Sequence, residues 1–146
     1  MKVEQKVKFY MWLLLQNRNW TSDRLAARGW THNAACCLCN QEIDSAAHIL
    51  LRCSFVKEVW LLASTTHPMV AGVALSTATT KERWSKTVGE APKANKKEEC
   101  RFAAYTAWNL WNERNRQTFQ GVSLDGEGVL QRIRDDVALL KEAFWE

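Results

Sequence analysis

Residues 36–53 read CCLCNQEIDSAAHILLRC and place three thiols and one imidazole at the spacing Cys36-x2-Cys39-x8-His48-x4-Cys53. Zn²⁺ prefers four tetrahedral sulfur and nitrogen ligands, and a Cys₃His set fills all four positions, which leaves none open to a substrate. The spacing therefore predicts a closed, structural zinc site, and it favours a metal-stabilised binding module over a catalyst.

The residues between these ligands predict local structure that would bring the ligands together. The two residues inside the C-x-x-C pair suit a tight turn, which lets both sulfurs approach one ion. Ser45 has the position of an N-cap for a short helix over residues 46–52, whose first turn carries His48. His48 and Arg52 would share one face of that helix, and Cys53 follows at its end.

Other cysteines and histidines leave alternatives open. A cysteine is often only a small buried apolar residue, but two short ligand spacings in one segment favour a metal site. Cys37 could exchange with Cys36, although its spacing to the next cysteine is too tight for the usual turn. His32 could compete with His48. We expect two further residues to lie apart from the metal: His67 and Cys100.

The composition is that of one folded domain, or of one domain with a small zinc lobe. The chain has 146 residues, of which 47% are apolar, and its eight tryptophans occur along the whole length. Its net charge of +4 is divided as +3 over residues 1–60, +2 over residues 61–95 and −1 over residues 96–146. The positive bias accompanies the metal segment, but a bias of this size also fits an ordinary solvated surface.

Neither an export signal nor a membrane span is predicted. Residues 1–6, MKVEQK, are too charged to begin the apolar part of a signal peptide, and the apolar run over residues 11–15 is too short to cross a bilayer. We therefore expect an intracellular protein of the nucleus or cytoplasm, where a reducing environment leaves the cysteines free to bind metal.

Apolar periodicity and capping signals predict an all-α fold. Helices are expected over residues 3–17, 22–28, 55–62, 96–119 and 126–145, with Gly29 and Gly121 ending the second and the fourth. The predicted architecture is a small zinc-stapled helical lobe followed by a long C-terminal helical hairpin. Three segments result: a zinc domain over residues 5–62, a variable, loop-rich linker with room for a short helix over residues 63–95, and an amphipathic hairpin over residues 96–146.

Several segments occur in an order that resembles a known family. They are FYMWLL at residues 9–14, TSDRL at residues 21–25, the C-x-x-C turn, SAAHIL at residues 45–50 followed by Cys53, and the pair Val59-Trp60. This order resembles the reverse transcriptase zinc-binding domain of plant non-LTR (LINE-type) retrotransposons and of proteins derived from them. The resemblance covers about residues 5–62. Ser45 and Ile49 stand where the family usually has Thr and Leu, and Cys37 is an extra thiol.

The resemblance implies which residues bind zinc and where in a retrotransposon such a domain lies. It implies zinc on Cys36, Cys39, His48 and Cys53, and a position downstream of a reverse transcriptase, where such domains are thought to help hold element RNA or DNA. The segment WNLWNERNRQTF at residues 108–119 also resembles one that commonly follows this domain.

An enzyme is disfavoured by what the sequence lacks. No aromatic-x-Asp-Asp polymerase motif and no spaced carboxylate set for ribonuclease H occurs in it. A redox C-x-x-C pair belongs after a strand in an α/β fold, and no strand pattern precedes Cys36. We therefore expect a separated part of an element that is not an enzyme.

Two hypotheses for function remain. In the first, the module binds RNA or single-stranded DNA through basic side chains on phosphates and stacking of unpaired bases on an exposed tryptophan. The candidate residues are Arg24, Arg28, Arg52, Lys57 and Trp30, with Trp20 as a second stacking candidate. In the second, zinc only stabilises the fold, and the Trp-rich helices contact a protein partner. An exposed tryptophan patch without a basic rim would favour the second hypothesis.

Overall fold

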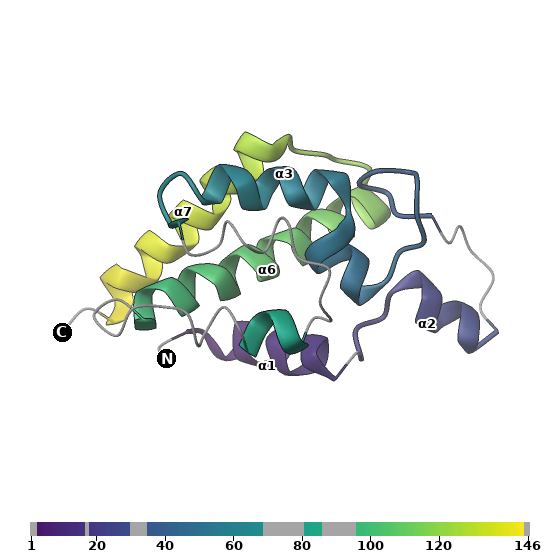
Figure 1. Cartoon of the computed structure of the whole chain (residues 1–146), viewed down its shortest axis with the longest axis horizontal. Helices are drawn as coiled ribbons and strands as arrows, with labels where there is room; N and C mark the ends of the chain where they lie inside the picture. The colour runs from purple at the N-terminus through teal and green to yellow at the C-terminus, as the bar shows by residue number, and fades with distance from the viewer. Residues whose placement is uncertain (1–2, 17, 30–34, 69–80, 86–95, 145–146) are drawn as a thin grey trace.

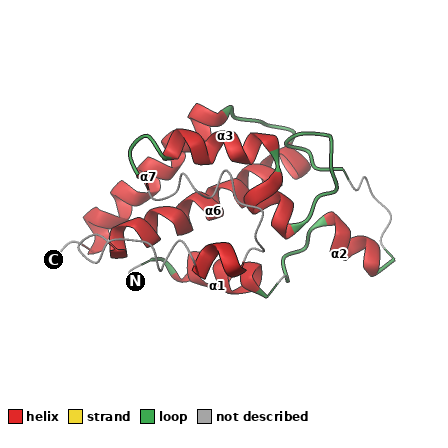
Figure 2. Ribbon diagram, viewed as in Figure 1, coloured by secondary structure: helices red, strands yellow, loops and turns green. Residues whose placement is uncertain are grey.

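A computed structural model describes the chain over residues 3–16, 18–29, 35–68, 81–85 and 96–144. Its elements are α1 (Gln5–Leu15), α2 (Ser22–Ala27), the π-helix η1 (His48–Arg52), α3 (Ser54–Ala63), α6 (Lys96–Gln120) and α7 (Gly126–Phe144), with a further helical turn over residues 81–85. Figure 2 shows these helices joined by loops. Over the described ranges the only β pairing is a single antiparallel bridge between Ala35 and Ile43, which confirms the predicted all-α class.

The helix ends follow the capping signals of the sequence. Gly29 and Gly121 come shortly after α2 and directly after α6, and their φ angles of 80° and 66° lie in the left-handed region that glycine adopts at little cost. The start of α2 is also as predicted, since the carbonyl of Thr21 accepts the first backbone hydrogen bonds of the helix. α1 is shorter than the predicted 3–17, because the backbone of Glu4 is extended.

α6 and α7 form the predicted antiparallel hairpin, and Figure 1 shows them running in opposite directions. Asn109 of α6 donates a side-chain hydrogen bond of 2.9 Å to Asp136 of α7. The fully buried carboxylate of Glu113 accepts the backbone N–H of Leu124 at 3.0 Å and the amide of Gln117 at 2.7 Å. Glu113 therefore fixes the connection between the two helices by accepting a partly buried backbone donor of the segment that joins them.

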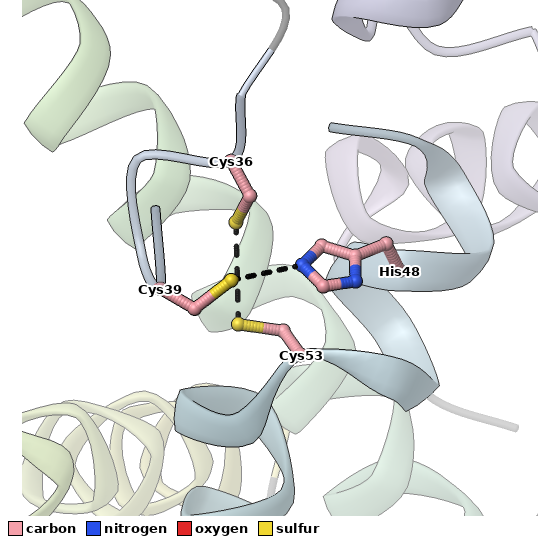
Figure 3. A group of neighbouring side chains, drawn as sticks. All are labelled: Cys36, Cys39, His48 and Cys53. Atoms are coloured by element: carbon pink, nitrogen blue, oxygen red, sulfur yellow. Dashed lines mark hydrogen bonds between the residues drawn. The ribbon is translucent and has the colours of Figure 1, made fainter. Parts of the chain in front are cut away.

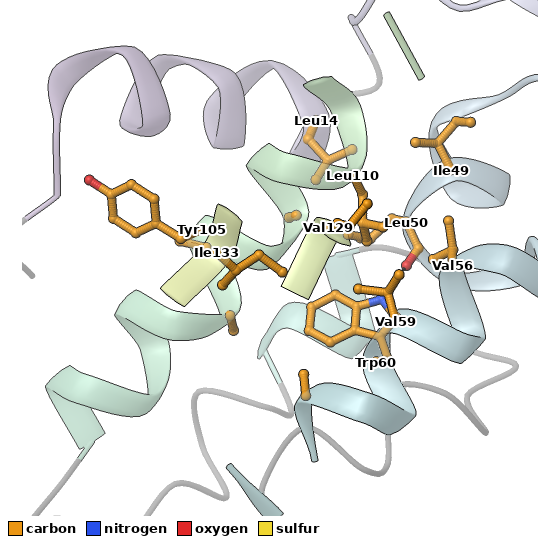
Figure 4. Packing of buried hydrophobic residues seen from close by; sticks show 14 of the residues in the cluster. Leu14, Ile49, Leu50, Val56, Val59, Trp60, Tyr105, Leu110, Val129 and Ile133 are labelled. Carbon is orange, nitrogen blue, oxygen red and sulfur yellow. Dashed lines mark hydrogen bonds between the residues drawn. The ribbon is translucent and has the colours of Figure 1, made fainter. Parts of the chain in front are cut away.

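One hydrophobic core unites the metal segment with the hairpin. α6 contacts α1, η1 and α7, while α3 packs against η1 and α7. Figure 4 shows side chains of all these helices meeting in one cluster, and the largest fully buried ones are Tyr105, Phe102, Ile49, Leu51, Leu110, Leu130 and Ile133. Because burial of apolar surface drives folding, the parts that share this core stabilise one another.

The tryptophans of α6 pack against α1. The ring of Tyr10 lies edge-on to Trp108, with centroids 5.5 Å apart, and stacks on Trp111 at 5.9 Å. Trp108 and Trp111 are therefore half-buried contacts between helices, and they do not form a free aromatic patch. No helix among the described residues combines the length and the apolar character that crossing a bilayer requires.

Candidate metal centre

Four side chains converge on one point between the loop before η1 and the start of α3 (Figure 3). The sulfurs of Cys36, Cys39 and Cys53 and a ring nitrogen of His48 all lie within 4.8 Å of one another. The Cys36 and Cys53 sulfurs are 4.0 Å apart, and the Cys39 sulfur is 3.3 Å from Nε2 of His48. Zinc–sulfur bonds of about 2.3 Å in a tetrahedron separate two sulfurs by about 3.8 Å, so the donor atoms and their spacing fit zinc.

The first two ligands are held by a short hairpin, the knuckle, over residues 35–43. Its arms are joined by the Ala35–Ile43 bridge and by a hydrogen bond of 2.7 Å from the N–H of Cys36 to the carbonyl of Glu42. Asn40 closes the turn with a φ of 56°, a conformation that Asn tolerates better than most residues. The knuckle thus turns the first two thiols of the set toward one point.

The other two ligands are brought together by a π-helical turn. The predicted cap is present, since Ser45 Oγ accepts the N–H of His48 at 3.1 Å. The turn then widens, and the N–H of Cys53 bonds the carbonyl of His48, five residues back, at 2.9 Å. This places Cys53 over His48. His48 is buried and Arg52, at the end of the turn, is exposed, so the two side chains differ in burial.

The hydrogen bond between Cys36 and Cys53 shifts the pKa values of the two thiols in opposite directions. The hydrogen bond to Cys53 and burial raise the pKa of Cys36 to about 12. The same hydrogen bond lowers the pKa of Cys53, and its effect exceeds that of burial. One sulfur of this pair therefore holds a proton that a metal ion must displace, because zinc binds thiolates.

The second ring nitrogen of His48 faces a carboxylate. Nδ1 lies 3.1 Å from Oε2 of Glu42, although the contact does not have the geometry of a hydrogen bond. A carboxylate beside the outer nitrogen of a ligand histidine favours the tautomer that presents Nε2 to the metal. Glu42 belongs to the knuckle, so the same loop positions two cysteines and places a carboxylate beside the imidazole.

A buried ion pair attaches the ligand loop to α6. Nη2 and Nε of Arg114 donate to the two carboxylate oxygens of Asp44 at 2.6 and 3.3 Å, and these side chains are 4% and 3% exposed. Sequence reasoning missed this pair. A signal was present in Arg114, which follows Leu110 and Trp111 by four and three residues and therefore lies on the same side of the predicted helix as these apolar residues.

Cys37 also faces α6 and not the metal site. Its sulfur contacts Oγ1 of Thr118 at 3.3 Å and the carbonyl oxygen of Arg114 at 3.5 Å. Burial raises the pKa of this thiol, so it stays protonated and can donate to these oxygens. The open alternative in which Cys37 exchanges with Cys36 is thus not the arrangement in this structure.

The remaining candidate ligands are accounted for. His67 stacks on Phe102 with ring centroids 3.6 Å apart, and Cys100 is buried on α6. Neither belongs to the cluster, as predicted. His32 lies outside the described residues.

The predicted nucleic-acid contacts are divided among several elements. The guanidinium groups of Arg24 and Arg28 both lie over the ring of Trp20, at 4.9 and 5.4 Å from its centroid. Arg52 is exposed at the end of η1, and Lys57 is half-buried on α3. Figure 1 shows α2 set apart from α3, so these residues do not form one cluster. Trp30, the other candidate, lies outside the described residues.

The helical fold and the Cys₃His cluster together define a zinc-binding helical module. Residues 1–60 match a family model described as zinc-binding in reverse transcriptase. The match supports a reverse transcriptase zinc-binding domain in this part of the chain and ends within α3, so that α6 and α7 lie outside it. No curated protein and no solved structure matches the chain.

Proposed function

We propose that this chain is a zinc-stabilised module that binds RNA or single-stranded DNA. It would serve a reverse transcriptase of the plant non-LTR retrotransposon type and have no polymerase or nuclease activity of its own. The observation that carries the proposal is the closed Cys₃His cluster inside the segment that matches the reverse transcriptase zinc-binding model. Four protein donors complete a tetrahedron, so zinc would shape the fold without taking part in a reaction.

The surroundings of the exposed tryptophans support nucleic acid over a protein partner. Trp12 and Trp20 are 51% and 50% exposed, and both have arginine side chains over their rings. An aromatic surface rimmed with cations suits phosphates and unpaired bases, whereas a protein partner would favour an apolar patch without charges.

A binding titration tests the proposal. Zinc-loaded protein, shown by metal analysis to hold one zinc per chain, is titrated into a labelled single-stranded RNA or DNA of mixed sequence. Because phosphate contacts release counterions, we expect the affinity to fall steeply when salt rises from about 50 to 200 mM. Absence of binding at the lower salt would overturn the nucleic-acid part of the proposal.

The alternative is a structural or protein-interaction domain in which zinc only stabilises the fold. Large apolar side chains that are exposed elsewhere favour it: Leu61, Phe119 and Leu139 are 51%, 75% and 63% exposed. This alternative predicts self-association or capture of a protein partner that Leu139→Ala weakens, with no dependence on nucleic acid. Light scattering on the purified chain and on the Leu139→Ala variant measures self-association.

A further inference from the structure

Three aromatic rings are exposed along α1 and the segment that follows it. Phe9 and Trp12 are one helical turn apart and stack on each other, with centroids 6.3 Å apart and planes inclined by 16°. The opposite face of α1 enters the core through Val7, Tyr10, Met11 and Leu14. Phe9 and Trp12 therefore point away from the core, and Trp20 extends the exposed aromatic surface toward α2.

Arginine side chains lie beside both tryptophans. The guanidinium of Arg18 is 5.9 Å from the Trp12 ring centroid, and those of Arg24 and Arg28 lie over Trp20. Cation–π attraction holds these charges at the rings. Nη1 of Arg24 also donates to the carbonyl of Asn19 at 3.5 Å, and a guanidinium has five N–H donors, so further donors remain to meet an anion. Both rings stay half exposed even with the arginines in place, so ring surface remains for a further stacking partner.

The net charge of the whole chain is concentrated in this segment. Residues 5–28 contain five Lys and Arg and one Asp, a net charge of +4, while the rest of the chain contains fifteen Lys and Arg and fifteen Asp and Glu. The chain outside residues 5–28 is therefore neutral overall. A local field of this kind attracts a polyanion to the same surface that offers the rings.

We infer that Phe9, Trp12, Arg18, Trp20, Arg24 and Arg28, which we call the aromatic strip, form the surface that binds single-stranded nucleic acid. Unpaired bases stack on the two tryptophans, and the arginines contact the phosphates between them. A duplex keeps its base faces covered, so the rings select single strands. This inference rests on the proposed function, and it assigns that function to α1 and α2 and not to the metal ligands.

Paired substitutions test the inference. The variant Trp12→Ala/Trp20→Ala removes both rings, and the matched control Phe119→Ala removes an exposed ring at the end of α6. Loss of base stacking should weaken binding of a single-stranded oligonucleotide about 5- to 150-fold for each tryptophan, while the control binds as the unchanged protein does. Zinc content and helicity should stay constant in all variants, because no strip residue is a metal ligand.

A second pair of variants tests the charges. The logarithm of the affinity falls linearly with the logarithm of the salt concentration, and the slope grows with the number of phosphates contacted. Arg24→Ala/Arg28→Ala should make this slope shallower by the contribution of about two phosphate contacts. Arg132→Ala/Arg134→Ala removes the same charge from exposed positions of α7 and should leave the salt dependence unchanged. Equal effects of the two variants would mean that net charge alone governs binding, and would overturn the inference.

The outcomes separate this inference from the proposed function. If the unchanged protein binds no single strand, the proposed function fails. If it binds and the tryptophan variant binds equally well, the function stands and the aromatic strip is the wrong surface. Tryptophan-dependent binding to anionic lipid vesicles with no binding to oligonucleotides would also overturn the inference, since it assigns the strip to a membrane surface.

Discussion

Cys36 and Cys37 are adjacent thiols whose side chains face different parts of the molecule. The Cys36 sulfur lies in the ligand cluster, while the Cys37 sulfur contacts the last turns of α6. Spacing favours Cys36 as the ligand but leaves the role of Cys37 open, and the backbone positions of the two residues decide it. The knuckle hydrogen bonds orient the first toward η1 and the second toward α6.

Serine substitutions of these cysteines should have opposite consequences. Cys39→Ser removes one of four zinc ligands, so we expect loss of bound zinc and a lower free energy of unfolding. Cys37→Ser is the matched control, because the hydroxyl can keep the hydrogen bond to Thr118; it should retain one zinc per chain. Metal analysis and thermal unfolding of the two proteins measure both effects, and zinc loss from Cys37→Ser would contradict the ligand assignment.

Zinc affinity should fall as pH falls. The Cys36 thiol holds its proton at neutral pH, because hydrogen bonding to Cys53 and burial raise its pKa to about 12. Zinc binds the thiolate, so binding releases this proton, and each released proton lowers the affinity about tenfold per unit decrease in pH. Competition with a chelator of known proton affinity between about pH 6 and 8 measures the slope. A zinc affinity that does not change with pH would contradict this protonation state.

At the scale of elements, two features decide how the metal segment is placed. The π-helical turn η1 puts Cys53 over His48, and the Asp44–Arg114 pair attaches the ligand loop to α6. The π-helical turn forms within a few residues of the chain. The Asp44–Arg114 pair joins residues 70 positions apart, and it makes α6 part of the module that holds the metal ligands.

Breaking the buried ion pair should destabilise the whole protein. Asp44→Asn leaves the guanidinium of Arg114 without its anionic partner, and we expect a loss of about 3 kcal/mol in the free energy of unfolding. Asp135→Asn at an exposed position of α7 should change it by less than about 0.5 kcal/mol. Denaturant unfolding of both variants compares the two costs. Equal, small effects would show that the pair contributes little to docking of the loop.

At the scale of the molecule, the segments predicted as a zinc domain and a hairpin share one core. Ile49 and Leu51 of η1 are fully buried beside Leu110 of α6 and Ile133 of α7. The matched residues 1–60 therefore bury their apolar side chains largely against helices outside the match.

Removing the hairpin should unfold the part that binds metal. A chain ending at residue 68 retains all four ligands but lacks α6 and α7, and its buried apolar side chains would be exposed to water. We expect low helicity and zinc binding much weaker than in the full chain. Circular dichroism and zinc titration of both chains measure this, and a stably helical short chain with full zinc affinity would contradict the shared core.

Much of the fold could be predicted from the sequence, and for local reasons. The helix ends at Gly29 and Gly121 and the cap at Ser45 are set by the conformations and hydrogen bonds of neighbouring residues. The four ligands were recognisable because a C-x-x-C turn and a capped helix form within a few residues. The exposed strip was only partly predicted: Trp20, Arg24 and Arg28 were named, but Phe9, Trp12 and Arg18 needed the orientation of α1 on the core.

The sequence by itself determined the all-α class, the helix ends at Gly29 and Gly121, and the four residues of the Cys₃His cluster, because each depends on residue types at short spacing. Only the tertiary structure decided that Asp44 pairs with Arg114, that Cys37 faces Thr118, and that η1 and the hairpin share a core. These contacts join residues tens of positions apart. They depend on how the helices pack, and no short-range pattern specifies which distant side chains then meet.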